Sequence, residues 1–307
     1  TLAAATRRVR AASAGNPESC LSNRQRAENS LLSAPTLFRH LLMSTIVDTF
    51  IAPPCHEAIG ILYQDEHLLL INKPSGLLSL SGKNPQNLDS VHHRLEQQFP
   101  GCTLVHRLDF GTSGLMVVAK NKTINAALSH QFSQRSVTKV YSALLCGHLR
   151  EDEGAIDAAI AKDPARFPRM AICAITGKPA RSRYRVTERL TREGAEGSLL
   201  PLSRVQLFPE TGRTHQIRVH MKHIGHTLFN DERYGGNEIL KGTHFSKYKQ
   251  FVNNCFETCP RQALHAMTLG FVHPRTGEEM FFTSPLPEDM TNLIDKWRNY
   301  ISNREEL

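Results

Sequence analysis

The sequence predicts an α+β fold in which helices flank a mixed, largely antiparallel sheet. Segments with the two-residue period of strands are interspersed with segments of helical period, and the two kinds do not alternate strictly along the chain. Strict alternation would instead indicate a doubly wound parallel sheet. With 307 residues, of which 40% are hydrophobic, the chain can form one large catalytic domain or two small ones.

Strand and helix patterns follow one another through the first half of the chain. Residues 60–76 (GILYQDEHLLLINKPSG) predict two short strands around a polar turn. Apolar residues one turn apart predict a helix over residues 91–99, and residues 114–120 (GLMVVAK) predict a strand. A second helix is predicted over residues 121–135, and a strand over residues 138–147.

The second half continues in the same way. Residues 203–226 predict a strand, a Pro-Glu-Thr-Gly turn and a helix with Thr214 as N-cap and Gly225 at its end. This helix would bury a stripe of apolar side chains: Ile217, Met221 and Ile224. Residues 267–285 predict a hairpin, and residues 290–301 a closing helix. That last helix would bury Leu293, Trp297 and Ile301.

The first 42 residues differ from the rest. They carry six arginines against two glutamates and show no sustained apolar period, so a disordered tail is expected over residues 1–42. The catalytic domain is then expected over residues 43–307, with a core at about 59–287. The first methionine is Met43, so two interpretations of the tail are possible. It is either sequence upstream of a translation start at Met43, which we favour, or a transit-like leader.

Composition also sets limits on function. The net charge of +8 and the pI of about 9.2 indicate a polyanionic partner, although half of the excess charge belongs to the tail. No run of eighteen apolar residues occurs, so no membrane span is expected. Seven scattered cysteines indicate free thiols in a reducing compartment, and we expect a cytoplasmic location.

No cofactor or metal is expected. The sequence contains neither a P-loop nor a dinucleotide-binding fingerprint. Cys255 and Cys259 form a single C-x3-C pair, and the histidines of residues 215–226 lack an H-E-x-x-H pattern, so a zinc site is not predicted.

One carboxylate stands out in the stretch HRLDFGTSG, residues 106–114. Asp109 is followed by two glycines and then by a strand, so it does not cap a helix. It could be a nucleophile exposed at a strand end, a metal ligand, or an Asx-turn that only connects two strands. From the residues alone these alternatives stay open.

Basic clusters point to nucleic acid. Residues 162–189 contain eight lysines and arginines, two aromatic residues and only two acids, although a solvated loop would look the same. Arg213, Arg218 and Lys222 form a second group that suits anion recognition or a solvated face. Tyr141 could be a core residue or a base-stacking platform. Together these features indicate a nucleic-acid-binding protein with a possible Asp nucleophile.

Five motifs carry a family resemblance. In order they are NKPSGLLS, VHRLDFGTSGLMVVAKN, KVYSALLCG, FPETGRTHQIRVHMKHIGH and NDERYGG. Over roughly residues 59–287 the chain resembles the RluA-type RNA pseudouridine synthases, in particular the short members that lack an N-terminal S4 module. The resemblance implies isomerisation of uridine to pseudouridine in RNA, without metal or cofactor. It points to tRNA and large-subunit rRNA as substrates and to a monomer.

The resemblance also implies residue roles. Asp109 would be the nucleophile, Tyr141 would pack on the target base, Arg218 would pair with Asp109, and Arg107 would help to hold the opened RNA. We further expect substrate binding by residues of the other motifs and of the basic stretch: Lys73, Arg213, His215, Gln216, Arg181 and Arg183.

Two departures from the family pattern bear on the substrate. Asn230 stands where the family often has glycine, and residues 237–261 form an insertion relative to the shortest members. The alternative is a non-catalytic RNA-binding protein or RNA chaperone on the same fold. An Asp-dependent phosphatase would require a second acidic residue near Asp109, and the stretch HRLDFGTSG contains none. The choice between a covalent and a glycal intermediate stays open.

Overall fold

The computed structural model describes residues 50–166, 168–190, 201–238 and 246–302. The predicted disordered tail, the candidate start at Met43 and Phe167 of the basic stretch lie outside these residues. Among the described residues, no helix is both long enough and apolar enough to cross a membrane.

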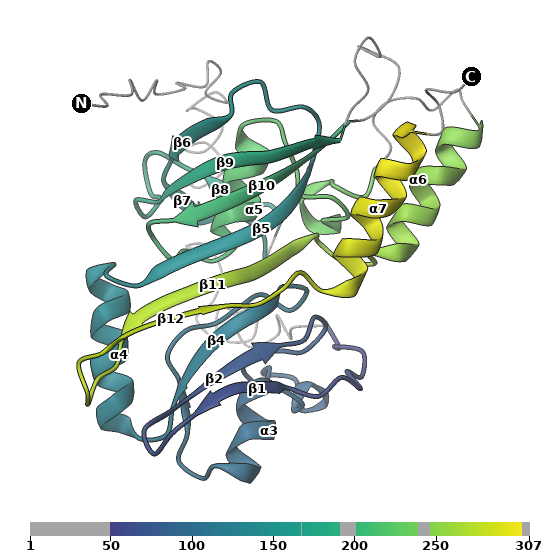
Figure 1. Cartoon of the computed structure of the whole chain (residues 1–307). Helices are drawn as coiled ribbons and strands as arrows, with labels where there is room; N and C mark the ends of the chain where they lie inside the picture. The colour runs from purple at the N-terminus through teal and green to yellow at the C-terminus, as the bar shows by residue number, and fades with distance from the viewer. Residues whose placement is uncertain (1–49, 167, 191–200, 239–245, 303–307) are drawn as a thin grey trace, which may run out of the picture.

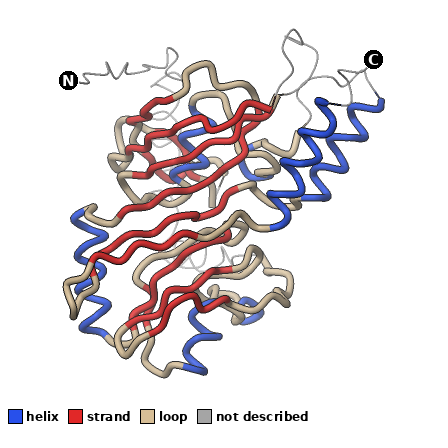
Figure 2. The backbone as a smooth tube through the Cα atoms, viewed as in Figure 1, coloured by secondary structure: helices blue, strands red, loops and turns tan. Residues whose placement is uncertain are grey.

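A single ten-stranded sheet runs through the described structure (Figures 1 and 2). Its order is β1-β2-β4-β11-β5-β10-β9-β6, with β12 paired to β11 and β3 paired to β4. The strands are β1 Gly60–Gln64, β2 Leu68–Lys73, β3 Thr103–Leu104, β4 Ser113–Ala119, β5 Thr138–Cys146, β6 Glu153–Asp157, β9 Arg181–Leu190, β10 Leu202–Pro209, β11 Leu264–Val272 and β12 Glu279–Thr283. Only the β4–β11 pair is parallel, which confirms the predicted α+β class.

Helices cover parts of this sheet, and two short strands form a separate ribbon. The helices are α3 Val91–Gln98, α4 Lys122–Gln134, α5 Gln216–His223, α6 Ser246–Thr258 and α7 Glu288–Ser302, with 3₁₀ turns η1 Pro85–Asn87 and η2 Glu232–Tyr234. The ribbon pairs β7 Ile160–Lys162 with β8 Met170–Ile172. The predicted helices and the hairpin are present, whereas α6, which lies in the insertion, was not predicted.

Side-chain caps start two of the helices. Ser90 accepts a hydrogen bond from the His93 N–H at the start of α3, and Asn121 accepts one from Ile124 at the start of α4. The predicted N-cap of α5 is wrong. The cap position is His215, with φ +54° and no side-chain cap bond, while Gln216 reaches back to bind the preceding turn.

Residues 246–261 of the insertion form part of the core, and residues 239–245 lie outside the described structure. In Figure 1, α6 and α7 lie side by side at one end of the sheet, and their apolar faces share a cluster that includes Val252, Trp297 and Leu293. Cys255 and Cys259 lie in this cluster, where burial raises the pKa of both thiols to about 12. The C-x3-C pair is therefore packed as protonated core residues.

Candidate active site

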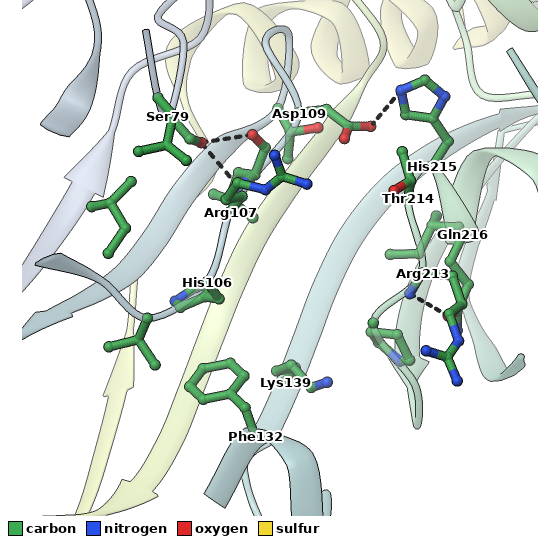
Figure 3. Close-up of a pocket in the computed structure, with 18 of the residues that line it drawn as sticks. Ser79, His106, Arg107, Asp109, Phe132, Lys139, Arg213, Thr214, His215 and Gln216 are labelled. Atoms are coloured by element: carbon green, nitrogen blue, oxygen red, sulfur yellow. Dashed lines mark hydrogen bonds and ion pairs between the residues drawn. The ribbon is translucent and has the colours of Figure 1, made fainter. Parts of the chain in front are cut away.

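An open cleft of about 1490 Å³ crosses the middle of the sheet. Most of its lining comes from four segments: residues 78–83, residues 103–112, the end of α4 with the start of β5, and residues 209–218. Seven of the ten predicted site residues lie on its wall: Arg107, Asp109, Tyr141, Arg213, His215, Gln216 and Arg218. Figure 3 shows the Asp109 turn facing His215 across the cleft.

The turn that carries Asp109 is held by backbone contacts. The Thr112 N–H donates to the Asp109 carbonyl (3.0 Å), and the Ser79 hydroxyl donates to the Leu108 carbonyl (2.7 Å). Gly114 has φ +119°, and a Cβ there would lie 2.3 Å from the Ala266 carbonyl oxygen of β11. Glycine is therefore required both by the backbone angle and by the close parallel strand.

A residue at the end of the insertion holds the same turn from the other side. The Arg261 side chain is 8% exposed and forms a bidentate pair with Asp289 at 2.6 and 2.9 Å. Its Nη1 also donates to the carbonyl oxygens of Gly111, Gln262 and Leu264. The start of α7 is thus linked to the Asp109 turn, a contact between distant segments that sequence reasoning missed.

Arg218 is the most heavily paired cation of the cleft. It forms a bidentate pair with Asp231 at 2.7 and 2.8 Å, and its Nη1 lies 3.1 Å from Asp109 Oδ2. Burial alone would lower the pKa of this guanidinium, but the bonds to Asp231 and Asp109 raise it above its ordinary value. The predicted Arg218–Asp109 pair is therefore present in the structure, and Asp231 holds Arg218 in place.

Asp231 was not recognised as a site residue, although the motif NDERYGG contains it. It is 1% exposed and follows Asn230, which has φ +55°. Asparagine tolerates this left-handed conformation better than most residues, which explains why it can replace glycine here. The Asn230 amide also donates to the carbonyls of Phe256 and Cys259, so it joins this turn to α6.

His215 lies close to the carboxylate but is neutral at physiological pH. Its Nε2 is 4.0 Å from Asp109 Oδ2, and its Nδ1 is 2.9 Å from the Tyr234 hydroxyl. Burial lowers the pKa of His215 to about 4. His215 therefore offers a hydrogen bond or a flat ring to a substrate, not a positive charge.

Tyr141 lies on β5 and faces the cleft near the carboxylate. Burial, together with the charge of Asp109, raises the pKa of its hydroxyl above the ordinary value. The side chain packs against two core clusters, one that includes Leu207 and one that includes Ala266. A protonated, firmly packed ring at this place suits stacking on a base.

Gln216 and Arg213 organise the neighbouring turn. The Gln216 amide oxygen accepts from Thr211 (2.6 Å) and from the Arg213 N–H (3.0 Å), and its nitrogen donates to Arg181 and Ser182. Gln216 is 4% exposed, so it positions the turn. The Arg213 Nε donates to the Pro179 carbonyl, which leaves the rest of its guanidinium at the cleft.

The structure does not bring Arg181 and Arg183 onto the cleft wall. Both lie on β9 and face Glu210, at 3.5 and 3.0 Å. Two further arginines of the basic stretch also have acidic partners, Arg185 with Glu153 and Arg189 with Asp152. The sheet therefore brings acids to a stretch that looked strongly basic in sequence.

Lys73 is also absent from the cleft wall. It is fully buried, and its ammonium group donates to the carbonyl oxygens of Pro74 (2.8 Å), Leu77 (2.8 Å) and Phe110 (3.2 Å). Burial lowers its pKa to about 7. Lys73 thus links the NKPSG loop to the residue after Asp109 and does not contact the substrate space.

Replacing Lys73 with methionine is therefore expected to reduce stability by about 1–3 kcal/mol, because three buried carbonyls lose their donor. RNA affinity should stay close to that of the unaltered chain. Urea unfolding and filter binding measure the two effects, and Lys83→Met, at an exposed position, serves as the stability control. A large loss of affinity with unchanged stability would contradict this placement.

One group of described side chains has the composition of a metal site. Ligand atoms of His92, Glu96 and Cys102 lie within 4.8 Å of one another. Burial and Glu96 raise the pKa of the Cys102 thiol to about 11, and its Sγ lies 3.7 Å from Glu96 Oε2. These contacts are those of a hydrogen-bonded group. The three residues do not place a metal ligand beside Asp109.

Acid is expected to destabilise the fold through His106. Its Nε2 accepts the Val117 N–H (3.1 Å), and burial, with the charge of Lys139, lowers its pKa to about 3. The unfolded chain takes up this proton near its ordinary pKa of 6.5. The free energy of unfolding should therefore fall as the pH drops below about 6.5, towards about 3.

Urea unfolding at about pH 7.5 and about pH 5 measures this effect. His106→Gln should make the dependence shallower, because His215 and His265 also have lowered pKa values, whereas His130→Gln, at an exposed position of α4, should leave it unchanged. Equal slopes for all three proteins would rule His106 out as its source.

Comparison with known proteins establishes the family. The RNA pseudouridylate synthase family matches residues 67–223, which include Asp109, Tyr141 and Arg218. The chain belongs to this family. The dual-specificity RNA pseudouridine synthase RluA of Vibrio vulnificus is 39% identical over 225 residues, or 73% of this chain and 82% of the relative. RluA of Escherichia coli K12 is 38% identical over 233 residues, or 76% and 95%.

Solved structures agree with this assignment. Human RNA pseudouridylate synthase domain containing 1 is similar with a TM-score of 0.56 and 29% identity, covering 80% of this chain and 97% of that one. Domain containing 4 has a TM-score of 0.57 at 24% identity, covers 78% and 93%, and supports the fold alone. The chain is thus an RluA-type RNA pseudouridine synthase, an isomerase that acts on uridine in RNA.

Proposed function

We propose that Asp109 is the nucleophile of this isomerase and that the substrates are tRNA, large-subunit rRNA or both. One observation carries the catalytic part. Asp109 is the carboxylate of the cleft that faces a buried guanidinium, with Arg218 at 3.1 Å. The other acid of the cleft wall, Glu210, already pairs with Arg181 and Arg183.

The chemistry follows from this arrangement. The target uridine leaves its stack and enters the cleft, where Tyr141 supports the base. When the bond between C1′ and N1 breaks, C1′ becomes electron-poor, and the Asp109 carboxylate captures or stabilises it. The base turns, C5 bonds to C1′, and the proton lost from C5 is balanced by one gained at N1.

The substrate part rests on the family. The curated relatives are named dual-specificity RNA pseudouridine synthases, which supports more than one RNA. We further propose that the enzyme acts as a cytoplasmic monomer, because its scattered cysteines indicate a reducing compartment and because Asp109, Tyr141 and Arg218 come together within one chain. Residues 1–42 are proposed to form a tail outside the catalytic domain.

Pseudouridine mapping tests the proposal. The tRNA and rRNA of a strain that lacks this chain are compared with those of strains that carry the unaltered chain or Asp109→Asn. Sites present only with the unaltered chain identify the substrates and support Asp109. Sites restored equally by Asp109→Asn would exclude the nucleophile. An RNA chaperone would instead change RNA folding without adding any site.

Turnover is expected to persist in excess EDTA, because the residues proposed to act on the uridine are a carboxylate, a guanidinium and a phenol. A tritium-release assay with and without chelator measures this. RNA folding is controlled by thermal melting of the substrate under both conditions. Loss of turnover that zinc or magnesium restores, with the RNA fold unchanged, would contradict the prediction.

A further inference from the structure

The cleft wall carries positive charge that no described acid neutralises. Lys83, Arg107, Arg135, Lys139 and Arg213 line it, and none forms an ion pair within the described residues. The arginines of β9 differ, since each of the four has an acidic partner. Unpaired cations in a concave surface favour a bound polyanion over solvent.

Arg135 and Lys139 are two of these cations that lie at the junction of α4 and β5. Arg135 ends α4 and is exposed, and Lys139 is half-buried near the start of β5. Burial and the nearby positive charge of Arg135 both lower the pKa of Lys139. An anion placed between them would offset the effect of this charge.

The backbone conformation of Arg135 is that of an ordinary helix C-cap. Its φ is +61°, and its N–H donates to the Gln131 and Phe132 carbonyls at the end of α4. This cap ends α4 four residues before Lys139, so that both cations lie at the junction of α4 and β5.

An aromatic surface adjoins the two cations. Phe132 lies one turn before Arg135, lines the cleft, and stacks on His106 with ring centroids 4.7 Å apart. The His106 ring is fixed because its Nε2 accepts the Val117 N–H. Figure 3 shows Phe132 beside Lys139, below the Asp109 turn. A flat, supported ring beside cations is suited to a nucleotide.

Spacing relates this group to the catalytic residues. Lys139 and Tyr141 lie two residues apart on β5, so their side chains share a face and are separated by about 6.8 Å. That distance is comparable to one nucleotide step in an extended strand. If Tyr141 supports the flipped uridine, the neighbouring phosphate falls near Lys139.

We infer that Phe132, Arg135 and Lys139 form a subsite for the nucleotide next to the target uridine. Arg135 and Lys139 bind its phosphate, and Phe132 stacks on its base. The inference rests on the proposed function, because Tyr141 defines where the uridine lies. It places the RNA over the end of α4, whereas the sequence alone predicted that the RNA binds the basic residues of β9.

The phosphate contacts are tested by the salt dependence of binding. The double variant Arg135→Asn, Lys139→Gln removes both charges, and asparagine suits the left-handed backbone. The control, Arg185→Gln with Arg298→Gln, removes two charges whose acidic partners are Glu153, Glu188 and Asp295. Both are made in the Asp109→Asn chain and titrated with unmodified tRNA transcripts. The slope of log Kd against log salt should fall by about 0.7 for the first, the value for one phosphate of a single strand, and stay unchanged for the control.

The stacking contact is tested at Phe132. Phe132→Leu keeps an apolar side chain in the core but should weaken RNA binding about tenfold, and Phe132→Tyr should restore it. Melting temperatures confirm that each variant is folded. An unchanged salt slope for the double variant, or unchanged affinity for Phe132→Leu, would overturn the subsite. The double variant could reduce the salt slope while the unaltered chain forms no pseudouridine. That result would support the subsite and reject the proposed function.

Discussion

Asp109→Asn is expected to form no detectable pseudouridine and to bind RNA about as well as the unaltered chain. Asparagine keeps the shape and an acceptor oxygen but loses the charge and the nucleophile. Binding should persist because the unpaired cations of the cleft remain. Tritium release measures turnover, and filter binding at matched salt measures affinity.

The structure also changes the expected effect on stability. From sequence, Arg218 would lose its partner in this variant, but Asp231 still pairs with it at two positions. Since the Asp109 side chain is 26% exposed, the cost should stay near 0.5–1.5 kcal/mol, about that of one hydrogen bond. Residual turnover would exclude the nucleophile. Equal loss of turnover and binding would instead mean that Asp109 only shapes the turn.

Asp231→Asn is expected to cause the largest loss of stability, about 3–5 kcal/mol, because it leaves the buried Arg218 short of charge compensation. The Asp231 side chain is 0% exposed and that of Arg218 is 7% exposed. This corresponds to a drop in melting temperature of roughly 10 °C for a domain of this size. Turnover should fall as well, since Asp231 holds the guanidinium beside Asp109.

Glu153→Gln is the matched control, because it removes one partner of the exposed Arg185–Glu153 pair. It should cost less than about 1 kcal/mol. Calorimetry measures the melting temperatures, and turnover is assayed well below both transitions. If Asp231→Asn has the same melting temperature as Glu153→Gln and keeps full turnover, Arg218 does not depend on Asp231 for its position.

Local chemistry made several parts of the molecule predictable. The two-residue and 3.6-residue periods located β1, β2, β4, β5 and most helices, because the side chains that face the core recur with the period of the backbone. The turn at Asp109 could be predicted from the sequence because Gly114 indicates an unusual backbone conformation. The resemblance of the motifs to the family also predicted that Tyr141 and Arg218 lie beside Asp109.

Other parts depend on contacts between distant segments. Arg261 reaches Gly111 only because β11 lies parallel to β4, and Lys73 is buried only because the NKPSG loop packs on the Asp109 turn. Asn230 and the insertion, the two departures from the family pattern, are in contact, because the Asn230 amide donates to the Phe256 and Cys259 carbonyls. Neither departure could be interpreted alone.

The sequence by itself determined the fold class, the strand-end carboxylate and the family, because each depends on residues that are close together in the chain. Only the tertiary structure decided which charges remain available to RNA. Adjacent strands neutralise the arginines of β9 with Glu153 and Glu210, whereas Arg135 and Lys139 meet no described acid. An ion pair forms over a few ångströms in space. Counting the charged residues of one stretch therefore misses an acidic partner that the sheet brings from a distant strand.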